Sequence, residues 1–103
     1  MIVVVAPTAV RLEEPDDVGR FHVEVEDGVV DVNAVLGDAG FGRIDDTTGE
    51  ALIPVDTVRQ AARGRVGSDW EAGFTKMLSY AESKGWLAED GAAIRAHIEV
   101  QPV

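Results

Sequence analysis

The chain contains no cysteine, which excludes disulfide bonds, thiolate nucleophiles and zinc sites built on cysteine. Serine is rare as well. The three serines, Ser68, Ser79 and Ser83, all fall in or beside one helical pattern, and none lies in a Gly-x-Ser-x-Gly sequence. That sequence holds the nucleophile of many hydrolases on a strained turn. The chain therefore does not have the pattern of a hydrolase with a nucleophile–base pair.

A long hydrophobic run is also missing. The apolar residues at the start of the chain end at Pro7, and no basic residue precedes them. A signal peptide needs a basic leader, and a membrane helix needs roughly 20 apolar residues. We therefore expect neither, and we expect a cytoplasmic protein. Arginine is commoner than lysine, and alanine, glycine, valine and aspartate abound. Because GC-rich codons encode these residues, we expect a bacterial source.

Positive charge is scarce. Acidic residues number 19 against nine lysines and arginines, which gives a formal net charge of −10. A negative field of this kind repels nucleic acids and anionic membrane surfaces. We expect no binding to either. The charge serves solubility alone, or it forms an acidic docking face for a basic protein partner.

What the chain does have is enough apolar sequence for one folded domain. It has 103 residues, of which 46% are hydrophobic. A domain of this size buries somewhat over ~60% of its unfolded surface, enough for one core without disulfides. The order of the patterns predicts a single α+β domain over 1–103. We expect a mostly antiparallel sheet of four to five strands, with a long amphipathic helix and two short helices packed on it.

Alternation of apolar and polar residues places the strands. The β-branched run at 1–10 predicts a strand buried on both faces. The stretch 11–19 loses this periodicity and gains proline and acids, so it predicts an exposed loop. Further strands are expected at 21–25, 42–45, 51–53 and 92–100, with 101–103 as a tail.

The helices are expected at 32–39, 57–63 and 68–84, where apolar residues recur with a helical period. Asp31 and Asp56 stand where N-cap residues accept backbone hydrogen bonds. Ser68 and Glu71 have the spacing of a capping box.

The longest helix carries one apolar stripe, formed by Trp70, Phe74, Met77, Leu78 and Ala81. A stripe of this kind predicts a core-facing helix, and we expect Trp70, Phe74 and Leu78 to pack at the centre of the core with Val3 and Val5. The alternatives are a dimer surface or a ligand groove. Tyr80 and Trp86 are expected to stay partly exposed.

Two distant stretches share the pattern Arg-x-His-x-Glu, at 20–24 and 95–99. If they pair antiparallel with His22 opposite His97, each arginine faces a glutamate. Opposite charges across a ladder stabilise it by about 0.2–1 kcal/mol per pair, whereas a parallel pairing would set like charges against each other. The pattern therefore predicts adjacent antiparallel strands at 20–26 and 94–100.

This strand pair holds the candidate functional residues His22, His97, Glu24 and Glu99. Imidazole and carboxylate groups act as general acids and bases, and they are ligands for zinc, manganese and non-haem iron. Alternating polar residues on a solvated sheet face produce the same pattern, however, and a metal site needs side chains that converge. We therefore predict no metal and no cofactor.

Two other patterns do not match known ligand sites. The acidic stretches 13–17 and 45–50 lack the oxygen spacing of calcium loops and predict solvated turns. The segment 64–68 precedes a helix and offers a place for an anion, but it lacks the Gly-Lys-Ser/Thr of phosphate-binding loops. It predicts a turn between two helices.

Two classes of function remain open. The first is a small acidic, non-catalytic binding or regulatory protein that acts through protein–protein contacts. The second is a small enzyme or ligand-binding protein that uses His22 and His97 with neighbouring Glu or Arg residues as acid–base groups. Because the same charge pattern is complementary to its own copy, we expect a homodimer rather than a monomer.

Overall fold

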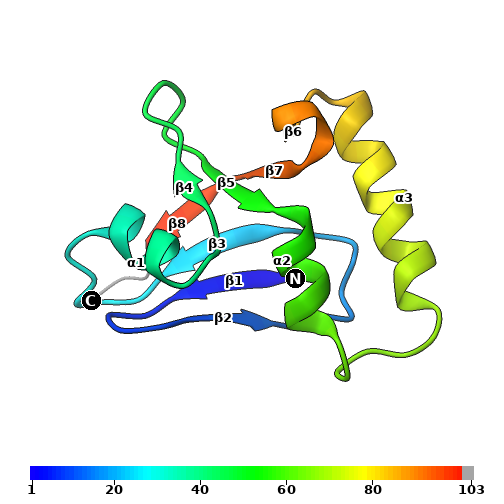
Figure 1. The fold of residues 1–103 in the computed structure, drawn as a ribbon, viewed down its shortest axis with the longest axis horizontal. Helices are drawn as coiled ribbons and strands as arrows, with labels where there is room; N and C mark the ends of the chain where they lie inside the picture. The colour runs from blue at the N-terminus through cyan, green and yellow to red at the C-terminus, as the bar shows by residue number, and fades with distance from the viewer. Residues whose placement is uncertain (101–103) are drawn as a thin grey trace.

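Strand β1 (Ile2–Val5) is buried on both faces, as its β-branched sequence predicts, but the single strand predicted at 1–10 is wrong in length, because the chain turns at 6–9. A computed structural model describes residues 1–100, and the tail expected at 101–103 lies outside them. β1 pairs antiparallel with β2 (Val10–Glu13) and parallel with β3 (His22–Val25). With β8 (Ile98–Val100), these strands form sheet A in the order β2-β1-β3-β8 (Figure 1).

The prediction of an exposed loop at 11–19 is partly wrong. Its first residues belong to β2, which forms a hairpin with β1 after the turn at 6–9. Leu12 is buried between two less buried neighbours, so β2 is amphipathic and contributes one buried side chain to the core. A single buried residue is too little alternation for a sequence pattern to reveal.

A second sheet, sheet B, lies above sheet A in Figure 1. Its strand order is β4-β5-β7-β6, and its three pairs are antiparallel. The expected hairpin at 42–53 is confirmed as β4 and β5. The strand bounds are β4 (Arg43–Ile44), β5 (Ala51–Pro54), β6 (Leu87–Ala88) and β7 (Ala93–Ala96), with a 3-10 turn η1 (Glu89–Gly91) between the last two.

Three α-helices accompany the sheets: α1 (Val32–Asp38), α2 (Val55–Ala62) and α3 (Trp70–Ser83). In Figure 1, α3 runs along the right-hand side, and α2 crosses in front of β1. The predicted class, α+β, is confirmed for the described residues. The predicted single sheet is wrong, because two four-stranded sheets are present. None of the described helices has the length and apolar composition needed to cross a membrane.

The helix starts follow the sequence only in part. At α1, Asp31 accepts a hydrogen bond from the Ala34 amide at 3.1 Å, as expected of an N-cap. At α2, the N-cap is Pro54, so Asp56 lies in the first turn instead. At α3, the predicted capping box is absent. Glu71 accepts a hydrogen bond from Arg59 on α2, which takes its carboxylate away from the cap.

The core lies between the two sheets and the helices. Trp70, Phe74, Val3 and Val5 belong to one buried cluster, as predicted, and Phe74 is the largest side chain that is fully buried. Leu78 is only partly buried, so its expected central place is wrong.

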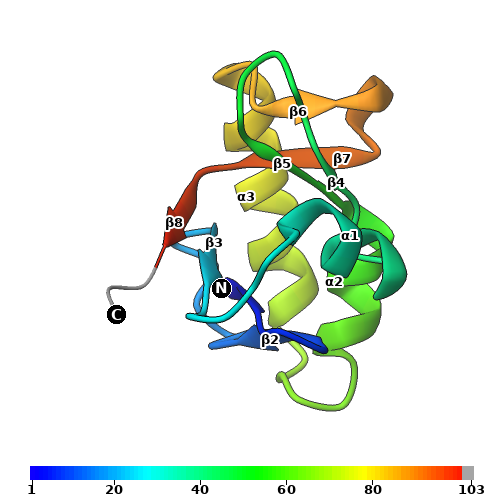
Figure 2. The ribbon, with the colours of Figure 1, turned by 90° about the vertical axis from the view of Figure 1, so that its left-hand side faces the viewer.

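The two histidine-containing stretches are neighbours, as predicted, but the predicted antiparallel direction is wrong. β3 and β8 run parallel, with Val23 opposite Ile98 and Glu24 opposite Glu99. The strand expected at 92–100 is also two strands, because the chain leaves sheet B after β7 and joins sheet A as β8 (Figure 2). Charge pairs in a ladder contribute too little to outweigh the burial of Ile94 and Ala96 on β7, from which the chain continues into β8.

Candidate functional site

A polar cluster lies where β3 and β8 run side by side. The Nε2 atom of His22 is 3.2 Å from Oε1 of Glu24 and 3.7 Å from Oε2 of Glu99. One ligand atom from each of the three residues lies within 4.8 Å of the others. The strand period places His22 and Glu24 on one face of β3, and the parallel register brings Glu99 beside them. The cluster therefore converges, which a flat ladder would not do.

The second histidine is not part of this cluster. His97 lies between β7 and β8, at the point where the chain passes from one sheet to the other. Its side chain is exposed, and its carbonyl accepts a hydrogen bond from the Val23 amide at 2.9 Å. Three of the four candidate residues thus come together, and the expected pairing of the two histidine side chains is not among them.

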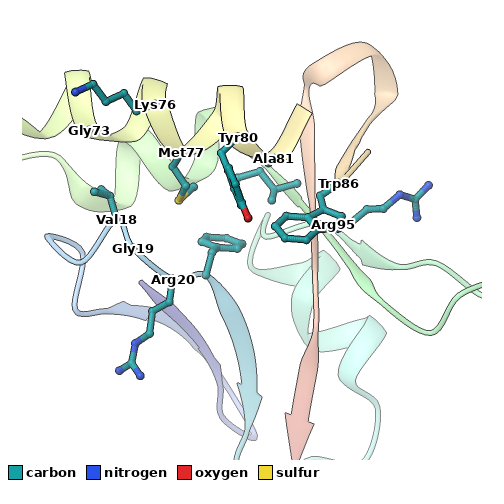
Figure 3. A pocket seen from close by; sticks show the side chains of 12 residues that line it. Val18, Gly19, Arg20, Gly73, Lys76, Met77, Tyr80, Ala81, Trp86 and Arg95 are labelled. Atoms are coloured by element: carbon teal, nitrogen blue, oxygen red, sulfur yellow. The ribbon is translucent and has the colours of Figure 1, made fainter. Parts of the chain in front are cut away.

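A cavity of about 410 Å³ lies between α3, the segment before β3 and strand β7. In Figure 3, the side chains of Val18, Met77, Tyr80 and Trp86 are directed into this space, and the Tyr80 hydroxyl points toward its middle. The lining is mostly apolar and contains no histidine and no carboxylate among the described residues. Its apolar and aromatic side chains are Val18, Phe21, Met77, Tyr80, Trp86 and Ile94.

The aromatic residues of the chain divide into two groups around this cavity. Phe41, Trp70 and Phe74 are buried in the core. The other three, Phe21, Tyr80 and Trp86, all line the cavity. Tyr80 is 58% exposed and Trp86 is 46% exposed, as expected from the sequence. Their rings meet edge to face, with centroids 5.7 Å apart. Every aromatic side chain outside the core therefore converges on one place.

Three basic residues stand at the rim of the cavity, and their charged ends point outward in Figure 3. Arg20 pairs with Glu14 at 2.8 Å, and this hydrogen bond raises the pKa of the guanidinium above its ordinary value. Arg95 pairs with Asp45, also at 2.8 Å. The Arg95 guanidinium lowers the pKa of the Asp45 carboxyl, and the Thr47 amide assists it. These pairs fix the rim without placing charge inside the cavity.

The start of the chain holds one wall in place. The α-ammonium of Met1 donates hydrogen bonds to the carbonyls of Asp17 and Arg20, at 2.6 and 2.7 Å. Burial lowers the pKa of this ammonium below its ordinary value. Both acceptors flank Val18 and Gly19, which line the cavity. The buried first strand thus positions the segment that faces α3.

Sequence reasoning missed the cavity because its walls come from three distant parts of the chain. The signals available were the apolar stripe, for which a ligand groove was one alternative, and the expected exposure of Tyr80 and Trp86. An exposed aromatic pair after a helical stripe indicates a surface for binding, but it does not locate the facing wall.

Comparison of the chain with protein-family models, with curated proteins and with solved structures found no match.

Proposed function

We propose that this protein is a non-catalytic binding protein that holds a small apolar molecule in the cavity beside α3. The observation that carries this proposal is the convergence of Phe21, Tyr80 and Trp86 on a cavity of about 410 Å³. Sites for small molecules are mostly apolar hollows of roughly 300–1,000 Å³ with few polar groups. The volume and the lining both fall within this description.

The driving force for such binding is the removal of apolar surface from water. Tyr80 and Trp86 keep about half of their surface exposed. Covering apolar surface contributes about 25 cal/mol per Å². An apolar ligand between these rings and Met77 is therefore stabilised without a charged partner. The Tyr80 hydroxyl, which points into the cavity (Figure 3), is available to hydrogen-bond one polar atom of the ligand.

Binding is favoured over acid–base catalysis by the histidines and glutamates named above, because the described lining contains none of them. General acid–base catalysis requires a titratable group within hydrogen-bond reach of the substrate. The acid–base hypothesis placed His22 and His97 at a shared pocket, but neither lines the cavity. The carboxylates of Glu24 and Glu99 are likewise outside it.

A protein partner is the second candidate, and the exposure of Tyr80 and Trp86 favours it specifically. Tyrosine, tryptophan, methionine and arginine are enriched at protein interfaces, and all four occur at this cavity. In that case the cavity receives an apolar side chain of the partner, and the net charge of −10 attracts a basic chain.

Titration with the neutral fluorescent probe N-phenyl-1-naphthylamine tests the proposal. We expect saturable binding of one probe per chain. Tyr80→Ala and Trp86→Ala should each weaken binding at least about tenfold, which corresponds to ~1.4 kcal/mol. Leu78→Ala is the matched control, because Leu78 is on the same helix but does not line the cavity. Circular dichroism checks that each variant is folded.

Two outcomes would contradict the proposal. Probe binding that never saturates would show that the cavity does not select a small molecule. An equal loss in Leu78→Ala would show that the aromatic residues act through stability alone. If the probe does not bind but Tyr80→Ala abolishes capture of a basic protein, the second candidate replaces the first.

A further inference from the structure

We propose that His22, Glu24 and Glu99 form a binding site for a divalent transition-metal ion, of which Zn²⁺ is the test case. This inference is independent of the cavity. It also replaces the expectation of no metal, which assumed an antiparallel, flat ladder. That assumption is wrong, because β3 and β8 run parallel and the three side chains converge.

The donor set is the first step. One imidazole nitrogen and two carboxylates are ligands that zinc and manganese accept. The cluster is not only acidic, since the His22 nitrogen is within 3.2 Å of Glu24 and 3.7 Å of Glu99. Zinc–ligand bonds of about 2.0–2.2 Å place tetrahedral donors roughly 3.3–3.6 Å apart. The two distances from the His22 nitrogen are close to this spacing, and the two carboxylate oxygens lie within 4.8 Å of each other.

The backbone register is the second, independent observation. Glu24 and Glu99 are direct partners in the parallel ladder. Like charges in opposite positions destabilise a strand pair. The positive charge of Arg20 interacts with Glu24 and offsets part of this repulsion, but the two carboxylates remain opposite each other. A bound dication placed beside the His22 nitrogen neutralises both carboxylates at once.

The three proposed ligands differ in how firmly the sheet holds them, so the site is partly preorganised. His22 and Glu24 lie on β3, an interior strand with a neighbour on each side, and their side chains are only 17% and 28% exposed. Glu99 lies on β8, an edge strand, and is 56% exposed. Two ligands are therefore held by the sheet, and the third is free to adjust. Three protein ligands leave at least one coordination position for water or for a further ligand.

Isothermal titration of the chelator-treated chain with ZnCl₂ tests this site. We expect one ion per chain with a dissociation constant on the order of 10 µM or tighter. His22→Ala and Glu99→Gln should each weaken binding at least about tenfold. His97→Ala is the matched control, because it removes the only other histidine, which is exposed and outside the cluster. It should change the affinity less than about twofold.

Absorption of the Co²⁺ form provides a second readout, which reports on the ligands of the ion directly. Binding through one imidazole and two carboxylates should give visible d–d bands that disappear in His22→Ala and persist in His97→Ala. Glu99→Gln changes an exposed residue on an edge strand and should leave the fold intact. It therefore tests the site even if His22→Ala does not fold.

Three results would overturn the inference. The first is no Zn²⁺ binding up to millimolar concentration, which would leave the cluster as an ion pair only. The second is binding that His22→Ala and Glu99→Gln leave unchanged. The third is an equal loss of affinity in His97→Ala, which would show an adventitious ion on surface groups only.

Discussion

The N-terminal half of α3 packs into the core, whereas the other end of the helix borders an open cavity. Trp70 and Phe74 are buried and stack with ring centroids 4.6 Å apart. Tyr80 and, just after the helix, Trp86 meet edge to face and are largely exposed. Both ends carry large aromatic side chains. The apolar stripe itself passes from the buried Trp70 and Phe74 to Met77, which lines the cavity. The elements that face the helix therefore decide which part of it becomes core and which part borders a cavity.

The cavity begins where Gly73 on α3 meets the segment before β3. A Cβ atom at this position would be 3.1 Å from Cγ2 of Val18, so the segment before β3 touches the helix there. Both residues also line the cavity, which extends from this contact toward Tyr80. The helix and the segment touch here and at Trp70, whose indole bonds the Pro15 carbonyl, and open volume separates them further toward Tyr80.

Among the variants that test this difference between the two ends of α3, Phe74→Ala is expected to lower the unfolding free energy most. Removal of a fully buried phenylalanine leaves a cavity and should cost about 3–5 kcal/mol of unfolding free energy. Leu78→Ala, one turn further along, should cost clearly less because Leu78 is only partly buried. Urea unfolding of both variants measures the difference. Equal losses would mean that the two parts of the helix are equally part of the core.

A smaller effect is expected from Trp70→Phe. The Trp70 indole donates a hydrogen bond to the Pro15 carbonyl in a buried setting. Phenylalanine leaves that carbonyl without this donor, at a cost of about 1–3 kcal/mol. Trp86→Phe at the exposed end should stay within about 0.5 kcal/mol, as is usual for surface positions. Thermal or urea unfolding compares the two tryptophans, and a larger loss in Trp86→Phe would reverse the comparison.

The smallest effect on the unfolding free energy at neutral pH is expected from Asp45, which pairs with Arg95 at the rim of the cavity. The Arg95 guanidinium lowers the pKa of Asp45 below its ordinary value of 3.8. Since the folded state favours the charged carboxylate, this contribution is fully present above the unfolded pKa. It is lost as the pH falls below about 3.8 and through the folded pKa. Unfolding free energies should therefore fall more steeply in acid for the native chain than for Asp45→Asn, and parallel curves would contradict this.

Much of the local structure was predictable from particular residues. The unbroken run at the start predicted the buried β1, Asp31 predicted the start of α1, and the turn at 46–50 predicted the hairpin of β4 and β5. The predictions failed where another element competes for a side chain. Glu71 had the spacing of a capping box but bonds Arg59 on α2. Asp56 was expected to cap α2, but the helix begins two residues earlier, after the β5 residue Pro54.

The candidate residues were predicted better than their arrangement. His22, Glu24 and Glu99 do lie together. Their convergence was missed because the predicted strand at 92–100 is split at His97 between two sheets. A ligand groove on the stripe of α3 was one alternative, and Met77 and Ala81 of that stripe do line the cavity. The facing walls were missed, since no periodicity links residues near 20, 77 and 95.

The sequence by itself determined what each segment is able to do: which stretches alternate, which faces are apolar, and how strongly acidic the chain is. These properties are local, because they depend on side-chain chemistry and on the fixed periods of strands and helices. Only the tertiary structure decided that β8 runs parallel to β3 and that Tyr80 borders a cavity. The direction of a strand depends on the route of the whole chain. Burial of core residues from both sheets outweighs ladder charge pairs of about 0.2–1 kcal/mol each.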